Sequence, residues 1–174
     1  MKRIILIDGN SLMYRAYYGT AFTGNLMQNS KGLYTNAIYA FIRMLDTLIN
    51  QKYDNILVAF DAGKQTFRHE ILDSYKDGRS PMPEEMRMQI PHIKEYLHLM
   101  NIKEYQLPLY EADDIIGTFA KEVDINDDFI ATIVSSDKDL LQLISDDVEV
   151  KLLKSKDYIR MNKETFYETY GIDP

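Results

Sequence analysis

Residues 3–11 read Arg3-Ile4-Ile5-Leu6-Ile7-Asp8-Gly9-Asn10-Ser11 and join a short apolar run to an acidic turn. The run from Ile4 to Ile7 is typical of a parallel strand that is buried on both faces. After it, Asp8-Gly9 predicts a turn, and Asn10 or Ser11 can serve as the N-cap of a following helix. In an open α/β sheet, ligands bind outside the carboxyl ends of the strands. The stretch therefore predicts a strand that delivers Asp8 to a ligand-binding edge.

The rest of the chain alternates between strand-like and helix-like patterns. Apolar or β-branched runs predict strands at 56–60, 102–107, 129–134, 148–153 and 158–161, the last two as a hairpin at a sheet edge. Helical spacing or capping signals predict helices at 35–49, 83–100 with a kink at Pro91, 111–123, 138–144 and 163–170. Strands that alternate with helices indicate an α/β fold with a mostly parallel central sheet flanked by helices. We expect one domain over residues 1–174.

Carboxylates follow the predicted strands at the points where ligands bind. Asp61 follows the strand at 56–60, and Asp137 and Asp139 follow the strand at 129–134. A further group, Glu111-Ala112-Asp113-Asp114, opens an apolar helix. Acidic groups gathered at one edge repel one another unless a cation lies among them, and hard divalent ions such as Mg²⁺ or Mn²⁺ prefer oxygen ligands. The candidate metal ligands are Asp8, Asp61, Glu111, Asp113, Asp114, Asp137 and Asp139.

Each of these acids also has a structural interpretation. Asp is common as a turn former and helix N-cap, and acids in a first helical turn are stabilised by the macrodipole. The pairs Asp127-Asp128 and Asp146-Asp147 lie between predicted elements and serve as internal controls, because we expect them to be solvated turns. Four acidic clusters after successive elements are harder to explain as turns than any single one. The pattern favours a two-metal phosphodiester enzyme, in which ions about 4 Å apart stabilise the attacking and leaving oxygens.

Composition sets the remaining bounds. The chain has 174 residues and a net charge of −7. It has no cysteine, which excludes disulfides and thiolate metal sites. Its apolar runs are too short for a membrane span, and the N-terminus lacks a signal-peptide pattern, so we expect a cytoplasmic protein. The negative charge is unusual for a nucleic-acid-binding protein, but the chain without its seven candidate ligands would be neutral.

Residues 62–80 differ from the rest of the chain. They are rich in Lys, Arg, His, Asp and Gly, and their apolar spacing does not suit a core helix. Arginine forks suit phosphate geometry and aromatic rings can stack on unpaired bases, which makes this stretch a candidate nucleic-acid contact. The alternative is a solvated surface segment, since acids are interspersed. The candidate contact residues here are Phe67, Arg68, Tyr75, Lys76 and Arg79, with Arg15 after the first strand as a weaker candidate.

Taken together, these motifs resemble the bacterial 5′-nuclease family, which includes the 5′→3′ exonuclease domain of DNA polymerase I and stand-alone flap endonucleases. The resemblance is carried in order along nearly the whole chain by Ile7-Asp8-Gly9-Asn10-Ser11 with Arg15, Thr35-Asn36-Ala37, Phe60-Asp61-Ala62, Phe67-Arg68-His69-Glu70, Tyr75-Lys76, Tyr110-Glu111-Ala112-Asp113-Asp114-Ile115-Ile116-Gly117 and Ser136-Asp137-Lys138-Asp139-Leu140.

The resemblance implies a PIN-like (Rossmann-like) domain that cleaves 5′ flaps, RNA primers and nicked or branched DNA with two Mg²⁺ ions, Mn²⁺ being a substitute, in bacterial replication and repair. It implies metal-site roles for the seven carboxylates and places a helical arch at about 64–82. On that arch, Arg68 and Lys76 would bind and activate the scissile phosphate, and Tyr75 would stack on a base. Arg15 and Arg79 would make further phosphate contacts. The family continues into a helix–three-turn–helix DNA-binding region that is absent here, so we expect an N-terminal fragment, with a polymerase region as a candidate downstream partner.

Two alternatives stay open from the sequence. A PIN-type endoribonuclease would use a similar acidic cluster on the same general fold, although the arch motifs argue against it. A non-catalytic DNA-binding or partner-binding module would fit the missing C-terminal region, although the full set of carboxylates argues against loss of the catalytic site.

Overall fold

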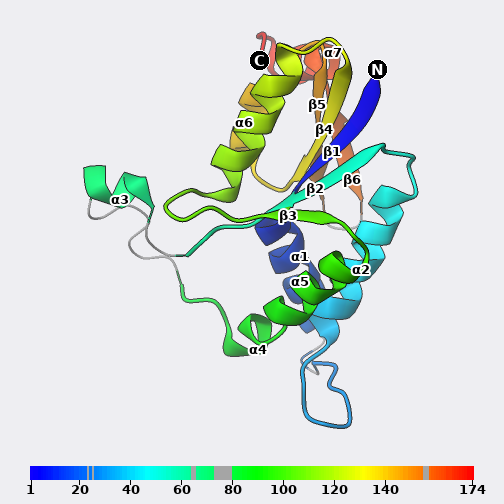
Figure 1. Ribbon diagram of the computed structural model, residues 1–174, viewed down its shortest axis with the longest axis vertical. Helices are drawn as coiled ribbons and strands as arrows, with labels where there is room; N and C mark the ends of the chain where they lie inside the picture. The colour runs from blue at the N-terminus through cyan, green and yellow to red at the C-terminus, as the bar shows by residue number, and fades with distance from the viewer. Residues whose placement is uncertain (23, 25, 64–65, 73–79, 155–156) are drawn as a thin grey trace.

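The fold is built on one six-stranded sheet, seen in the computed structural model of the chain, which describes residues 1–174 except 23, 25, 64–65, 73–79 and 155–156 (Figure 1). The strands are β1 (Lys2–Asp8), β2 (Asn55–Ala59), β3 (Lys103–Tyr105), β4 (Phe129–Ser135), β5 (Val148–Leu153) and β6 (Tyr158–Met161). Their order across the sheet is β3-β2-β1-β4-β5-β6. All neighbours are parallel except β5 and β6, which form an antiparallel edge pair. The predicted α/β class and the edge hairpin are confirmed.

The strand order reverses at the middle of the sheet. From β1 the chain first adds β2 and β3 on one side, and then returns to place β4 on the other side of β1. Such a switch point opens a crevice at the carboxyl ends of the two central strands, where α/β proteins bind their ligands. Here the crevice lies between the ends of β1 and β4.

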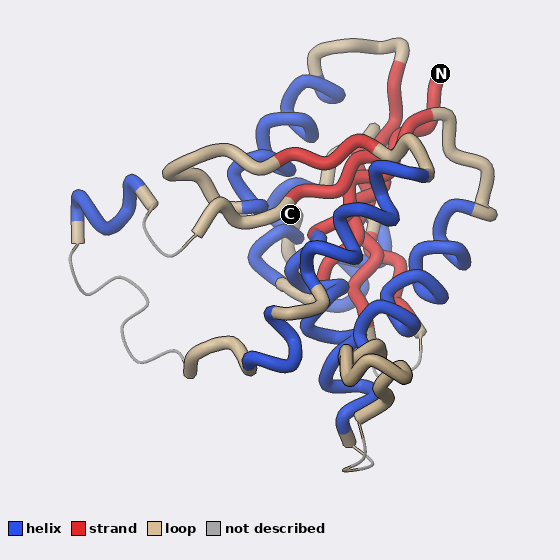
Figure 2. Tube along the Cα trace, turned by 60° about the horizontal axis from the view of Figure 1, so that its bottom comes forward, coloured by secondary structure: helices blue, strands red, loops and turns tan. Residues whose placement is uncertain are grey.

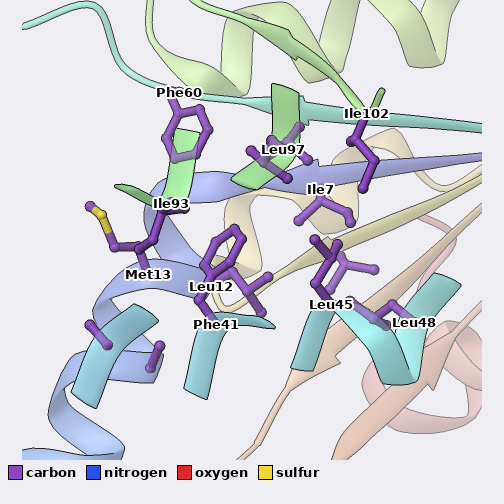
Figure 3. Packing of buried hydrophobic residues seen from close by; sticks show 14 of the residues in the cluster. Ile7, Leu12, Met13, Phe41, Leu45, Leu48, Phe60, Ile93, Leu97 and Ile102 are labelled. Atoms are coloured by element: carbon purple, nitrogen blue, oxygen red, sulfur yellow. The ribbon is translucent and has the colours of Figure 1, made fainter. Parts of the chain in front are cut away.

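Helices cover both faces of the sheet (Figures 1 and 2). The helices are α1 (Gly9–Ala21), α2 (Asn36–Ile49), α3 (Phe67–Ile71), α4 (Glu84–Arg87), α5 (Ile90–Leu99), α6 (Ala112–Asp124), the 3₁₀ helix η1 (Lys138–Leu143) and α7 (Lys163–Tyr170). Within β1, Ile5 and Ile7 pack with α1, α2 and α5, whereas Leu6 packs with α6 on the opposite face. This alternation is the period of two expected of a strand. Figure 3 shows the first of these clusters around Ile7 and Phe41.

Three local predictions need correction. The N-cap of α1 is Asp8, whose side chain accepts the backbone N–H of Ser11, rather than Asn10 or Ser11. The segment predicted as a helix at 138–144 is a 3₁₀ helix. The single helix predicted over 83–100 is two helices, α4 and α5, separated at residues 88–89.

Buried Gln89 explains the break between α4 and α5. Its Oε1 accepts the backbone N–H groups of Ala37 (2.8 Å) and Ile38 (3.1 Å), which are otherwise free donors at the start of α2. Its Nε2 donates to Asn36 Oδ1 (3.0 Å) and to the carbonyl oxygen of Glu85 (2.8 Å). A side chain at the break therefore caps a different helix, a contact that periodicity cannot reveal.

The described part of the predicted arch contains one short helix, α3. Its entry is tied to the loop before α6, because the Phe67 N–H donates to the carbonyl oxygen of Leu109 (3.0 Å) and Thr66 pairs with the same residue. Tyr75, Lys76 and Arg79 lie outside the described residues. Across the residues that the structure describes, every helix is too short or too polar to span a membrane.

Candidate metal centre at the carboxyl edge of the sheet

Asp8 and Asp61 lie at the ends of adjacent strands and are held by hydrogen bonds. Asp8 is buried; its Oδ1 accepts the Ser11 N–H (2.9 Å) and its Oδ2 accepts Ser135 Oγ (2.7 Å). Asp61 Oδ2 accepts Asn10 Nδ2 (2.7 Å), and its Oδ1 accepts the backbone N–H of Ala112 (2.8 Å). Each of the two carboxylates is therefore held by two neighbouring elements, as a binding group needs to be.

The first turn of α6 supplies three more acids, two of which have a structural role. Glu111 and Asp114 form a reciprocal capping box: the Glu111 side chain accepts the Asp114 N–H, and Asp114 Oδ2 accepts the Glu111 N–H (2.9 Å). Such a box stabilises a helix N-terminus by itself. Glu111 and Asp114 therefore do cap the helix, as the structural interpretation of these acids predicts, whereas Asp113 has no role in the cap.

The surroundings of the Asp113 carboxyl group strongly oppose its ionisation. Burial, together with the negative charges of Asp8, Asp137, Asp61 and Glu111, raises the pKa of Asp113 from 3.8 to about 7. Carboxylates from three strand ends and one helix start therefore lie close enough to oppose ionisation of one another. Burial also raises the pKa of Asp8, against the lowering effect of its hydrogen bonds from Ser11 and Ser135.

Asp137 and Asp139 occupy the turn after β4. Asp137 is the N-cap of η1, and its Oδ1 accepts the Asp139 N–H (2.9 Å). Asp137 is half-buried and faces the groove, whereas Asp139 is exposed and does not line it. The structure thus places four of the other six acids around Asp113. Asp114 lies beside this group, and Asp139 lies outside the groove.

The donor set suits a hard divalent cation, because it consists of carboxylate oxygens with no sulfur. In the described ranges, however, no three acidic or histidine side chains have the spacing of a metal-ion site. The acids lie close enough to shift a pKa but do not yet share one coordination point. A divalent ion would have to draw them inward, so the chemistry of the donors fits while their final geometry stays a prediction.

Arg68 joins this acidic group from α3. Its guanidinium makes a bidentate pair with Asp114, with Nη1–Oδ2 at 2.8 Å and Nη2–Oδ1 at 2.7 Å, and lies 3.8 Å from Glu111. The guanidinium also stacks on the Phe67 ring, 4.6 Å from its centroid, and that ring contacts Tyr110. The predicted phosphate-binding arginine is therefore at the acidic edge, where it partly balances the carboxylates.

A groove of about 1230 Å³ runs from the acids along α1 and α2. Near the acids it is lined by Asp8, Asp61, Asp113 and Asp137, and further along by Arg15 and Arg43 among others. Arg15 thus shares the groove with the acids, as its predicted role requires.

Three residues that organise the acids were not predicted from the sequence to do so. Asn10 holds Asp61, and Ser11 and Ser135 bind Asp8. Asn10 and Ser11 stood in the quoted motif but were interpreted as caps. Ser135 carried no signal beyond its place at the end of a strand.

The chain is similar to known proteins along nearly its whole length. Residues 3–171 match the family model described as the 5′-3′ exonuclease, N-terminal resolvase-like domain. The chain is 43% identical to DNA polymerase I of Geobacillus stearothermophilus over 98% of the chain and 19% of that protein. It is 37% identical to the 5′-3′ exonuclease of Bacillus subtilis (strain 168) over 99% of the chain and 59% of that protein. The chain therefore spans a fifth to three fifths of the length of these relatives.

Among solved structures, the chain is similar to a bacteriophage T5 flap endonuclease in a pseudo-enzyme-product complex with DNA and metal ions. The TM-score is 0.68 at 18% identity, and the match covers 99% of this chain and 62% of that one. This likeness confirms the predicted PIN-like fold. On the strength of the family match over nearly its whole length, the chain belongs to the family of 5′-3′ exonuclease N-terminal, resolvase-like domains.

Proposed function

We propose that this chain carries the catalytic centre of a divalent-metal-dependent 5′→3′ exonuclease and 5′-flap endonuclease that hydrolyses DNA and RNA-primer phosphodiesters in replication and repair. One observation supports this most strongly: Asp113 lies within electrostatic range of Asp8, Asp61, Asp137 and Glu111. A partly buried group of like charges is costly to assemble, and in a groove it is a candidate functional site.

The residues would divide the work as follows. Asp8, Asp61, Asp113 and Asp137 would hold Mg²⁺, with Glu111, Asp114 and Asp139 as further candidate ligands. Two such ions supply charge stabilisation for the attacking and leaving oxygens of the phosphodiester. Arg68 would leave Asp114 and pair with the scissile phosphate, since a guanidinium fork binds either anion. Arg15 lies in the same groove and would contact a neighbouring phosphate.

The location proposed for this activity is the bacterial cytoplasm at the nucleoid, because the relatives named above are bacterial proteins of DNA metabolism. In that setting the partners would be DNA with a 5′ flap or nick, and an RNA primer on DNA. A downstream polymerase region would be a further partner in the longer protein.

The test is cleavage of labelled 5′-flap DNA, with and without Mg²⁺, by this chain and by a version extended to the length of the relatives. Asp113→Asn is the informative variant, because Asp114→Asn would also remove a helix cap. Asp127→Asn is the matched control. We expect Mg²⁺-dependent cutting that only Asp113→Asn abolishes. Cutting of single-stranded RNA but not flap DNA would instead favour an endoribonuclease, and binding of DNA without cutting would favour a non-catalytic module.

A further inference from the structure

Three serine hydroxyls lie between the ends of β1 and β4, at the switch point of the sheet. Ser11 is in the first turn of α1, Ser135 ends β4, and Ser136 follows it. Ser11 Oγ is 3.1 Å from Ser135 Oγ, and Ser136 Oγ donates to Ser11 Oγ at 3.0 Å. Ser135 is fully buried, and its hydroxyl donates to Asp8 Oδ2 at 2.7 Å. The hydroxyls thus form a continuous path that ends on a carboxylate.

The carboxylate fixes the direction of this path. Asp8 Oδ2 accepts the Ser135 hydroxyl, so the single proton of Ser135 Oγ points to the carboxylate. Ser11 must then donate to Ser135, and Ser136 donates to Ser11. Backbone groups fill the remaining acceptor positions of Ser11 and Ser135. The Ser136 N–H donates to Ser11 Oγ (3.2 Å), and the Asp137 N–H donates to Ser135 Oγ (3.0 Å). Because every hydroxyl in this chain donates towards Asp8, the chain holds the Asp8 carboxylate at its end in one orientation.

We infer that Ser11, Ser135 and Ser136 are positioning residues that hold the Asp8 carboxylate for a divalent cation. This inference rests on the proposed function. Both oxygens of Asp8 already accept one hydrogen bond, from the Ser11 N–H and from Ser135 Oγ, which sets the plane of the carboxylate and directs its remaining lone pairs. Ser135 also binds the backbone of Asp137, so one hydroxyl links two candidate ligands from β1 and from the turn after β4.

The measurement is Mn²⁺ binding to the 174-residue chain by titration calorimetry, with thermal unfolding recorded for each variant in EDTA. Outer groups that orient a metal ligand typically contribute 10- to 100-fold in affinity, so we expect Ser135→Ala to weaken Mn²⁺ binding about 10-fold. Ser136→Ala acts two hydrogen bonds away, and we expect it to weaken binding about threefold. Ser136→Thr keeps the hydroxyl on an exposed residue and is expected to restore the affinity. Ser30→Ala, an exposed serine in a distant turn, is the control.

The outcomes separate the inference from the proposed function. Mn²⁺ affinity within twofold of the wild type in both Ser135→Ala and Ser136→Ala would overturn the inference and leave the metal centre standing. Failure of Ser136→Thr to restore a loss seen in Ser136→Ala would also overturn it, since the hydroxyl would not be the cause. A wild-type chain that binds no Mn²⁺ would overturn both. If Ser135→Ala does not fold, Ser11→Ala and Ser136→Ala carry the test.

Discussion

Acidic pairs lie at the two ends of α6, and they behave differently. Asp113-Asp114 opens the helix beside the carboxyl ends of β1 and β2, where burial and like charges raise the pKa of Asp113 to about 7. Asp127-Asp128 follows the helix before β4 starts, and both residues are exposed. In an open parallel sheet, the ligand crevice lies at the carboxyl ends of the strands, so acids at that edge share a partly buried groove, whereas the Asp127-Asp128 pair at the opposite edge is exposed. The position of an acid relative to the strands therefore matters more than the acidic motif itself.

The largest effect should come from removing one negative charge in the first turn of α6, whereas removing one beyond the other end of the helix should have no effect. Asp113→Asn is expected to lower Mg²⁺-dependent flap cleavage by about 1000-fold. Where residues act as one catalytic unit, removing one member lowers the rate nearly as much as removing all of them. Asp127→Asn should cleave as the wild type does. Single-turnover rates on the same labelled flap provide the comparison, and equal rates for the two variants would remove the distinction between the two edges.

The next effect concerns Arg68, the cation beside the acids. Arg68→Gln should lower cleavage by about 100-fold, since it removes a preorganised donor to the phosphate, and should leave Mn²⁺ affinity undiminished. Arg160→Gln is matched to it, because it also breaks an ion pair, with Glu149, at the antiparallel edge. Rates and Mn²⁺ titrations on both variants test this. A loss of Mn²⁺ affinity in Arg68→Gln equal to its loss of rate would contradict a phosphate role.

A smaller effect is expected at Asn10, which holds Asp61. Asn10→Ala removes the 2.7 Å hydrogen bond to Asp61 Oδ2 and should weaken Mn²⁺ binding about 10-fold. Asn126→Ala, at the opposite edge, should not change it. Calorimetric titration gives both affinities, and an unchanged value for Asn10→Ala would mean that Asn10 does not position Asp61 for the ion.

The smallest effect is on stability in the absence of metal. Because the pKa of Asp113 is raised from 3.8 to about 7, the folded chain binds this proton more tightly than the unfolded chain does. Its contribution to the free energy of unfolding therefore falls as pH rises from about 4 to about 7. Denaturant unfolding in EDTA at several pH values should show a wild-type-minus-Asp113→Asn difference that decreases over this range. A difference that increases would contradict the raised pKa.

Much of this fold follows from local sequence patterns. The apolar runs located all six strands, and strand–helix alternation gave the mostly parallel sheet with its edge hairpin. Periodicity could not predict the break between α4 and α5, because Gln89 at that break caps α2 from a distance of 52 residues along the chain. Nor could it predict that Asp8 itself caps α1.

The candidate site was predicted in part, for a related reason. Acids after strands could be read from the sequence, because parallel strands share a carboxyl edge. The groups that hold the acids could not, since Ser135 meets Asp8 only after β1 and β4 pair across 127 residues. The pairing of Arg68 with Asp114 likewise depends on how the loop before α6 meets α3. The roles of Tyr75, Lys76 and Arg79 stay predictions.

The most direct test of the metal centre is an anomalous difference map from crystals of the chain soaked in Mn²⁺. We predict a peak among Asp8, Asp61, Asp113 and Asp137, with the carboxylates drawn together and no peak at Asp127-Asp128. A map with no peak at the carboxyl edge, or with its strongest peak at the opposite edge of the sheet, would contradict it.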